Sequence, residues 1–176
     1  MLVLVTLVAL VVTACGGSGS GAPARTAAAQ KPLPAGPRPS SISKMVCIPK
    51  TQRELAEVFG VKASVPAATW VHHRYGCAYR YPDGAMELSV KELSSWPETI
   101  AYFQALGRQL GVATKLNGLG QGAFQARDGS VVVRKDWKVL VVDTTGLPSP
   151  FGRPPTSSAD VAVTVADVIL GCWAGD

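Results

Sequence analysis

The apolar run at the start of the chain is the feature that most constrains how the rest can fold. Residues 1–12 are apolar except for one threonine, and Cys15 follows shortly after them. A helix that spans a bilayer needs roughly 20 apolar residues, whereas the apolar region of a secretory signal peptide has about 7–15. The run therefore predicts a signal peptide over residues 1–14 and a separate folded part after it. No Lys or Arg precedes Arg25, so we expect the positively charged region of the signal to lie upstream of the first residue.

The residues at the end of this run, Val12-Thr13-Ala14-Cys15, resemble the lipobox of bacterial lipoproteins. In that family an aliphatic residue at −3 and small residues at −2 and −1 precede a cysteine. The resemblance implies cleavage before Cys15 and a diacylglycerol on its sulfur. It therefore implies an anchor in the membrane and a location on the outer face of the cytoplasmic membrane, in the cell envelope.

The segment after Cys15 has little apolar surface to bury. Residues 16–44 are mainly Gly, Ala, Ser and Pro, so we expect a disordered tether over residues 15–44 and a single domain over residues 45–176. Four of the 17 basic residues and none of the 12 acidic residues lie in this tether. The domain is then almost neutral, which argues against nucleic acid as a partner. The basic tether suits an anionic membrane surface or, alternatively, only keeps the linker soluble.

The hydrophobic pattern of the domain predicts a helix, two strands, a helix, three strands and a final helix. The helices are expected at 49–60, 95–111 and 157–173, and the strands within 69–82, 85–93 and 122–145. Asp128-Gly129 predicts a type I′ hairpin among the last strands. The order predicts an α+β fold in which an antiparallel sheet of about five strands is covered on one side by two to three helices.

Lipidation of Cys15 would leave Cys47, Cys77 and Cys172 for disulfide formation. Pairing Cys47 with Cys77 would close a loop of about 30 residues around the first helix, and a pair that involves Cys172 is the alternative. If Cys47 and Cys77 pair, Cys172 remains a thiol, which we expect to be buried on the apolar face of the last helix. The cysteines lack C-x-x-C spacing, so no metal site is expected.

Several segments together resemble a group of actinobacterial secreted lipoproteins that share a domain of unknown function. They are "CIPKTQRELAEVFGV", "GCAYRY" and "LNGLGQGAF", followed by a β-meander and a closing helix. The resemblance implies a surface lipoprotein without assigned catalysis and a disulfide between Cys47 and Cys77. Cys172 departs from the pattern of the group.

Aromatic residues gather around Cys77 and are the candidates for lining a ligand site. In an extended strand, alternate residues share a face, which puts three tyrosines with Cys77 on one side. They could line a pocket for a glycan or lipid, or they could be the buried face of the sheet. The candidates are Trp70, Tyr75, Tyr79 and Tyr81.

No constellation in the sequence identifies a reaction or a cofactor. His72 and His73 are neighbours on an expected strand and would point to opposite faces. The carboxylates of Asp83, Glu87, Glu92 and Glu98 have no spacing typical of an enzyme and are expected to be solvated. The leading hypothesis is a non-catalytic, lipid-anchored binding or accessory protein with an unknown envelope ligand or protein partner. The alternatives are an envelope hydrolase and a carrier of lipids or other apolar ligands with an internal cavity.

Overall fold

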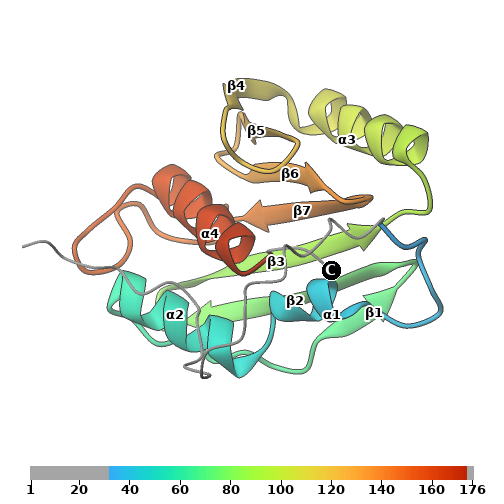
Figure 1. Ribbon diagram of the computed structural model, residues 1–176. Coiled ribbons are helices and arrows are strands. Elements are labelled where there is room, and N and C mark those ends of the chain that lie inside the picture. Colours follow the sequence, from blue (N-terminus) through green and yellow to red (C-terminus); the bar gives the residue numbers. More distant parts are fainter. Residues whose placement is uncertain (1–31, 174–176) are drawn as a thin grey trace, which may run out of the picture.

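The computed structural model describes residues 32–173, which form one seven-stranded antiparallel sheet with four helices (Figure 1). The strands lie across the sheet in the order β1-β2-β3-β7-β6-β5-β4. Their bounds are β1 Thr69–Val71, β2 Arg74–Tyr81, β3 Gly84–Glu92, β4 Val112–Leu116, β5 Gly122–Ala126, β6 Val131–Lys135 and β7 Lys138–Asp143. The expected α+β class and antiparallel sheet are confirmed. The sheet has two strands more than the five expected, because β1 was predicted as one strand with β2 and β4 was not predicted.

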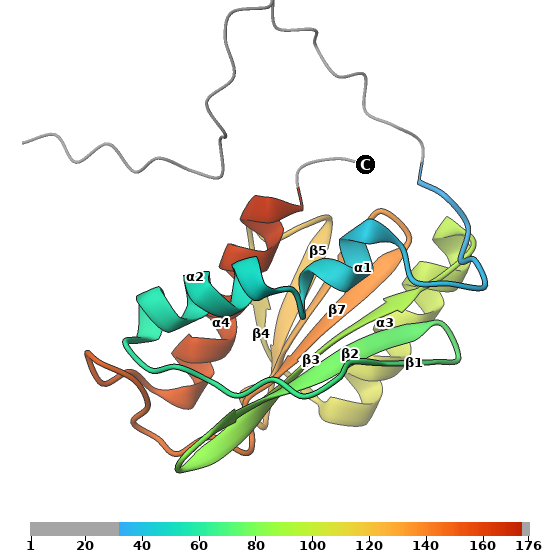
Figure 2. The same cartoon turned by 90° about the horizontal axis from the view of Figure 1, so that it is seen from below.

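Helices lie on both faces of the sheet, so the expected one-sided cover is wrong. Three helices cover one face and α3 covers the other (Figure 2). The bounds of the helices are α1 Ser41–Met45, α2 Pro49–Phe59, α3 Trp96–Leu110 and α4 Ser158–Cys172. The two-sided cover follows from strands β6 and β7, which have consecutive buried apolar residues and so are apolar on both faces.

Strand β6 shows how consecutive apolar residues produce this arrangement. Val131 and Val133 pack in the larger core beneath α4, whereas Val132 packs in a smaller core beneath α3. Unbroken apolar runs are typical of strands that are buried on both faces. The smaller core consists of Leu93, Phe124, Ala126, Val132 and Val139, and half-buried side chains of α3 pack against it.

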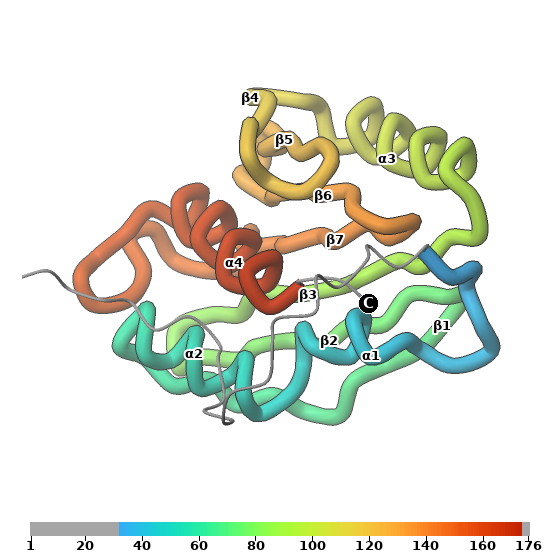
Figure 3. Tube along the Cα trace, in the orientation of Figure 1, coloured from blue at the N-terminus to red at the C-terminus, as the bar shows by residue number. Residues whose placement is uncertain are grey.

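The folded part begins before the boundary expected at residue 45. The backbone N–H of Ala35 donates to the carbonyl of Leu93 at 3.2 Å, and the indole N–H of Trp70 donates to the carbonyl of Pro37 at 3.1 Å. The trace of residues 32–40 passes beside β1 before it enters α1 (Figure 3). Composition placed the boundary too late because these residues are held by hydrogen bonds rather than by apolar side chains. Residues 15–31, the rest of the expected tether, lie outside the described residues.

The buried carboxylate of Glu92 anchors this N-terminal segment to the sheet. Glu92 is 5% exposed, and its Oε1 accepts hydrogen bonds from the N–H of Ser40 at 2.7 Å and the hydroxyl of Ser43 at 2.5 Å. Ser40 is also the N-cap of α1. Lys138, which is 3% exposed, lies opposite Glu92 in the β3–β7 register. Glu92 therefore has a structural position, and the expectation that it is solvated is wrong.

Candidate functional site

A groove with apolar walls lies between α3 and the β4–β5 end of the sheet. It comprises two adjoining depressions of about 280 and 350 Å³. Both are lined by Phe103, Val112 and Phe124, and we call them together the α3–β4 groove. The two phenylalanine rings meet edge to face with their centroids 5.1 Å apart. Sites for small molecules typically have volumes of roughly 300–1,000 Å³, so the whole groove has the size of a small-ligand site.

A tight connection between α3 and β4 places this groove. The helix ends at Leu110, its C-cap Gly111 has a φ of +71°, and β4 begins at the next residue, Val112. This φ favours glycine, and a Cβ there would also lie 2.9 Å from the side chain of Arg127. One turn earlier, a Cβ on Gly107 would lie 3.3 Å from Val112 and 3.7 Å from Phe124. The two glycines thus let the end of the helix approach the strands closely.

Arg134 of β6 lines the smaller of the two depressions. Its guanidinium lies 4.5 Å from the ring centre of Trp96 and 5.6 Å from that of Phe103. Gly122 is its partner in the β5–β6 register, and a Cβ on Gly122 would lie 2.9 Å from Nε of Arg134. Because Gly122 has no side chain, the guanidinium of Arg134 can lie over this position of β5. Cation–π contacts contribute roughly 0.5–2 kcal/mol each, so the two rings hold the side chain in place.

One nitrogen of this guanidinium has no acceptor. Nη1 of Arg134 is buried and makes no hydrogen bond within residues 32–173. An unpaired buried donor costs about 1–3 kcal/mol, and a charged one costs more. The aromatic rings stabilise the positive charge but cannot accept a conventional hydrogen bond from Nη1. An anion bound at this point would supply the missing partner.

The polar lining of the groove is basic or neutral. Lys115 and Arg134 line one depression together with Asn117, and Arg108 lines the other together with Gln104. None of the described residues that line the two depressions is acidic. Charges of one sign beside apolar walls concentrate the field and attract ions of opposite sign. The groove is therefore complementary to a ligand in which an anionic group is joined to an apolar body.

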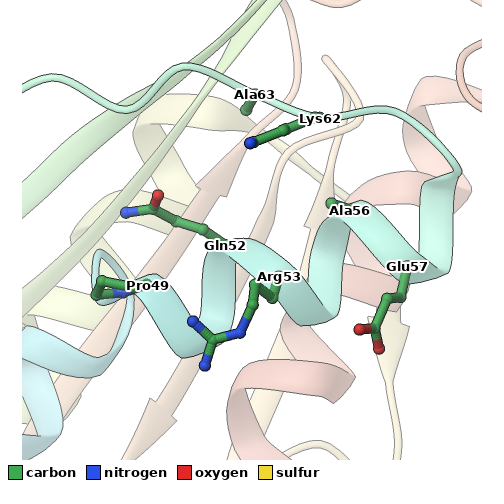
Figure 4. Close-up of a pocket in the computed structure, with 7 residues that line it drawn as sticks. All are labelled: Pro49, Gln52, Arg53, Ala56, Glu57, Lys62 and Ala63. Atoms are coloured by element: carbon green, nitrogen blue, oxygen red, sulfur yellow. The ribbon is translucent and has the colours of Figure 1, made fainter.

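A larger depression of about 520 Å³ lies between α2 and the segment that follows it (Figure 4). Its charged residues have both signs, since it is lined by Arg53, Glu57 and Lys62. Figure 4 shows the first two extending away from the segment that carries Lys62. The amide of Gln52, which also lines it, already donates to the carbonyl of Cys47 at 2.8 Å. This depression thus has no polar group that is both buried and unpaired, and we do not assign a ligand to it.

The aromatic residues expected to line a ligand site belong mostly to the core. Tyr75, Tyr79 and Tyr81 share the face of β2 that packs in the larger core, as the alternation predicted, and the last two are buried. The hydroxyl of Tyr79 donates to the carbonyl of Val46 at 2.7 Å. Burial raises the pKa of Tyr81 to about 12, and burial together with the neighbouring Tyr81 raises the pKa of Tyr79. Trp70 is half-buried on β1. The α3–β4 groove is lined by none of these four, and the alternative of core packing holds for the two buried tyrosines.

The disulfide joins Cys47 and Cys77, as expected. Cys47 precedes α2, and Cys77 lies in β2 with its side chain in the larger core. Cys172 at the end of α4 is half-buried, and its Sγ donates to Oε2 of Glu54 at 3.6 Å. The expectation that Cys172 is buried among apolar groups is therefore wrong, because the last turn of α4 faces a carboxylate of α2. Cys15, the expected site of lipidation, lies outside the described residues.

The other candidates for chemistry are separated. His72 and His73 form the turn between β1 and β2, and both have a positive φ, so their expected place within a strand is wrong. No group of three or more His, Cys, Asp and Glu side chains within residues 32–173 has the arrangement of a metal site. None of the helices in that part of the chain has both the length and the apolar character needed to cross a membrane.

Sequence reasoning did not identify the groove residues. Arg134 stands in "VVVRK", where an arginine on an otherwise apolar face of a strand is unusual. That pattern is the one local signal that could have drawn attention to this position. Trp96, Phe103 and Gly122 approach it only through the packing of α3 on the sheet.

Comparisons of the chain with models of protein families, with curated proteins and with solved structures gave no match.

Proposed function

We propose that this protein is a lipid-anchored, non-catalytic binding protein on the outer face of the cytoplasmic membrane, and that the α3–β4 groove holds its ligand. The observation that carries the proposal is the guanidinium of Arg134. It lies against the rings of Trp96 and Phe103 beside an apolar groove, and its buried Nη1 lacks an acceptor within residues 32–173. A ligand with an anionic group would remove the cost of that unpaired donor.

The proposed location is supported by the sequence and by the disulfide. The apolar run, the lipobox-like residues before Cys15 and the resemblance to actinobacterial lipoproteins all point to export and anchoring. Disulfides persist in oxidising compartments and are rare in the reducing cytosol. The bond between Cys47 and Cys77 is compatible with that location.

Binding is favoured over catalysis by the residue types in the groove. General acid–base or nucleophilic catalysis uses groups such as His, carboxylates, Ser or Cys beside the substrate. The groove is lined instead by Phe, Val, Leu, Ala and Gly with Lys, Arg, Asn and Gln. A carrier with an internal cavity is less well supported than a surface binding site, because exposed side chains such as Val112 and Lys115 line the groove.

Filling the groove is expected to abolish binding. Val112 lines both depressions and is 43% exposed, so Val112→Trp adds a large side chain to the groove without burying it in the core. Full-length protein in phospholipid nanodiscs would be incubated with small molecules extracted from bacterial envelopes, and the retained compounds identified by mass spectrometry. We expect Val112→Trp to lower retention of the bound compound at least tenfold.

The chain offers a matched control for this substitution. Val58 of α2 is 42% exposed and lies outside the groove, so Val58→Trp should retain the same compound at the level of the parent protein. Equal retention by Val112→Trp and the parent would show that the groove is not the binding site.

Anchoring is tested by removing the proposed acyl acceptor. Cys15→Ala is expected to abolish acylation and to lower the amount of processed, membrane-anchored protein. Fractionation measures the anchored amount, and the mass of the N-terminal peptide shows whether it is acylated. Cys172→Ala removes a thiol elsewhere and should leave both readouts unchanged. A Cys15→Ala protein that is as acylated and as membrane-bound as the parent would contradict the anchor.

A further inference from the structure

We infer that the ligand of the α3–β4 groove is a carboxylate on an apolar chain, and that Arg134 binds the carboxylate group. The inference rests on the proposed function, since it names the ligand of that site. It follows from the geometry of the guanidinium, from the charges around it and from the path of the apolar walls.

A guanidinium held in this way matches a planar anion. Arginine presents its N–H groups as a rigid planar fork that pairs with both oxygens of a carboxylate. The rings of Trp96 and Phe103, at 4.5 and 5.6 Å, fix the orientation of the Arg134 fork before a ligand arrives. Such preorganisation lowers the entropic cost of binding. Trp96 is 37% exposed, so its ring borders solvent beside the guanidinium.

The charges around the guanidinium suit an anionic head group. Arg134 and Lys115 are the two cations that line the depression, and Asn117 adds a neutral amide. In the bound state the carboxylate pairs with Arg134. The exposed ammonium of Lys115 attracts the anion from solvent before it binds.

The apolar walls continue from the cation into the second depression. Phe103, Val112 and Phe124 line both depressions, and the second extends along α3 past Gly107. A chain attached to the carboxylate would therefore lie along the helix with its methylene groups against these three side chains. Each buried CH₂ group would add to the affinity in the way that apolar burial does.

The test uses decanoate as the probe and the full-length protein in phosphatidylcholine nanodiscs, with empty nanodiscs as the blank. Calorimetric titration should give an affinity for decanoate at least tenfold higher than that for decanol, which has the same chain without the charge. Equal affinities for decanoate and decanol, or no binding of decanoate, would overturn the inference. Tighter binding of decyl phosphate than of decanoate would assign the site to phosphate and would overturn it too.

Variants of the cation separate its contribution from that of the groove. Arg134→Met keeps an unbranched side chain of similar length and should lower the affinity for decanoate at least tenfold while leaving that for decanol unchanged. Arg80→Met, at an exposed arginine of β2 outside the groove, should change neither. If Arg134→Met does not fold, Arg134→Lys keeps the charge without the planar fork and should bind decanoate several-fold more weakly than the parent does. An unchanged affinity for decanoate in the variant that folds would overturn the inference.

The failure of this inference can be told apart from the failure of the proposed function. Suppose that Val112→Trp lowers the affinity for both decanoate and decanol, while Arg134→Met lowers neither affinity. The groove then binds ligands but does not recognise the carboxylate. If Val112→Trp changes neither affinity, the groove is not the binding site and both proposals fail.

Discussion

Replacement of Glu92 by alanine is expected to lower the free energy of unfolding by about 2–4 kcal/mol, because two hydrogen bonds to a buried carboxylate are lost and their donors are left without that acceptor. The substitution takes the acceptor away from the N–H of Ser40 and the hydroxyl of Ser43. The loss should appear in urea denaturation followed by circular dichroism, and hydrogen exchange should quicken first in α1.

The same strand supplies the control for this experiment. Glu87 lies on β3 with its side chain exposed, so Glu87→Ala should change the free energy of unfolding by no more than about 0.5 kcal/mol. Equal losses in the two variants would show that Glu92 contributes only as an ordinary strand residue. Retained protection of α1 in Glu92→Ala would contradict its role in anchoring the N-terminal segment.

Removal of the disulfide is expected to destabilise the protein by about 3–4 kcal/mol, because the bond closes a loop of 30 residues in the unfolded chain. The double variant Cys47→Ala, Cys77→Ala tests this, because replacing both cysteines leaves no thiol from the broken bond. The side chain of Cys77 is in the larger core, so part of the loss comes from packing. Equilibrium denaturation of the variant and of the parent protein measures the difference.

Cys172→Ala is the control for the disulfide and should cost about 1 kcal/mol or less, since the side chain is half-buried and outside the bond. A double variant as stable as the parent would contradict the predicted contribution of the disulfide. Peptide mapping under non-reducing conditions gives a second check, and a crosslink between Cys172 and either of the other two cysteines would contradict the pairing.

The helices α2, α3 and α4 were predicted from the sequence, whereas the short α1 and the start of α2 were not. Within the segment 49–60, Thr51 and Glu54 have the spacing of a capping box, but α2 begins at Pro49 after Ile48, which makes no side-chain cap. The hydroxyl of Thr51 donates instead to the carbonyl of Met45 at 2.6 Å. A proline is well suited to the first turn of a helix, and here it decided the start.

The hairpins show which turns a sequence reveals. His72-His73 and Asp136-Trp137 form tight turns with φ between +48° and +57°, values that non-glycine residues seldom adopt. His72-His73 therefore carried no turn signal, and the β1–β2 hairpin was predicted as one strand. The three strands expected within 122–145, by contrast, required a second connection, and Asp136-Trp137 supplies it between β6 and β7. Asp128-Gly129 does mark the β5–β6 hairpin, but only the glycine has a positive φ, so the expected type I′ turn, which needs two, is wrong.

The candidate site could not be predicted because its parts meet only in the folded protein. Strand β4 has four exposed residues out of five and no alternation, so local periodicity gives no strand there. The contact of Arg134 with Trp96 joins residues that are far apart in the sequence, and it depends on the position of α3 on the second face of the sheet. The buried face of β2 was predictable, because side chains alternate between the two faces along a strand and this alternation can be read from the sequence.

The alternation of side chains along β6 has a consequence for how proteins of this fold can diverge. Val131 and Val133 face the core that carries the disulfide, whereas Val132 and Arg134 face α3. Substitutions at one set of positions alter the groove, and substitutions at the other set alter the main core. We therefore expect related chains to exchange one ligand for another by changes confined to one side of the sheet, while selection for stability acts on the opposite side.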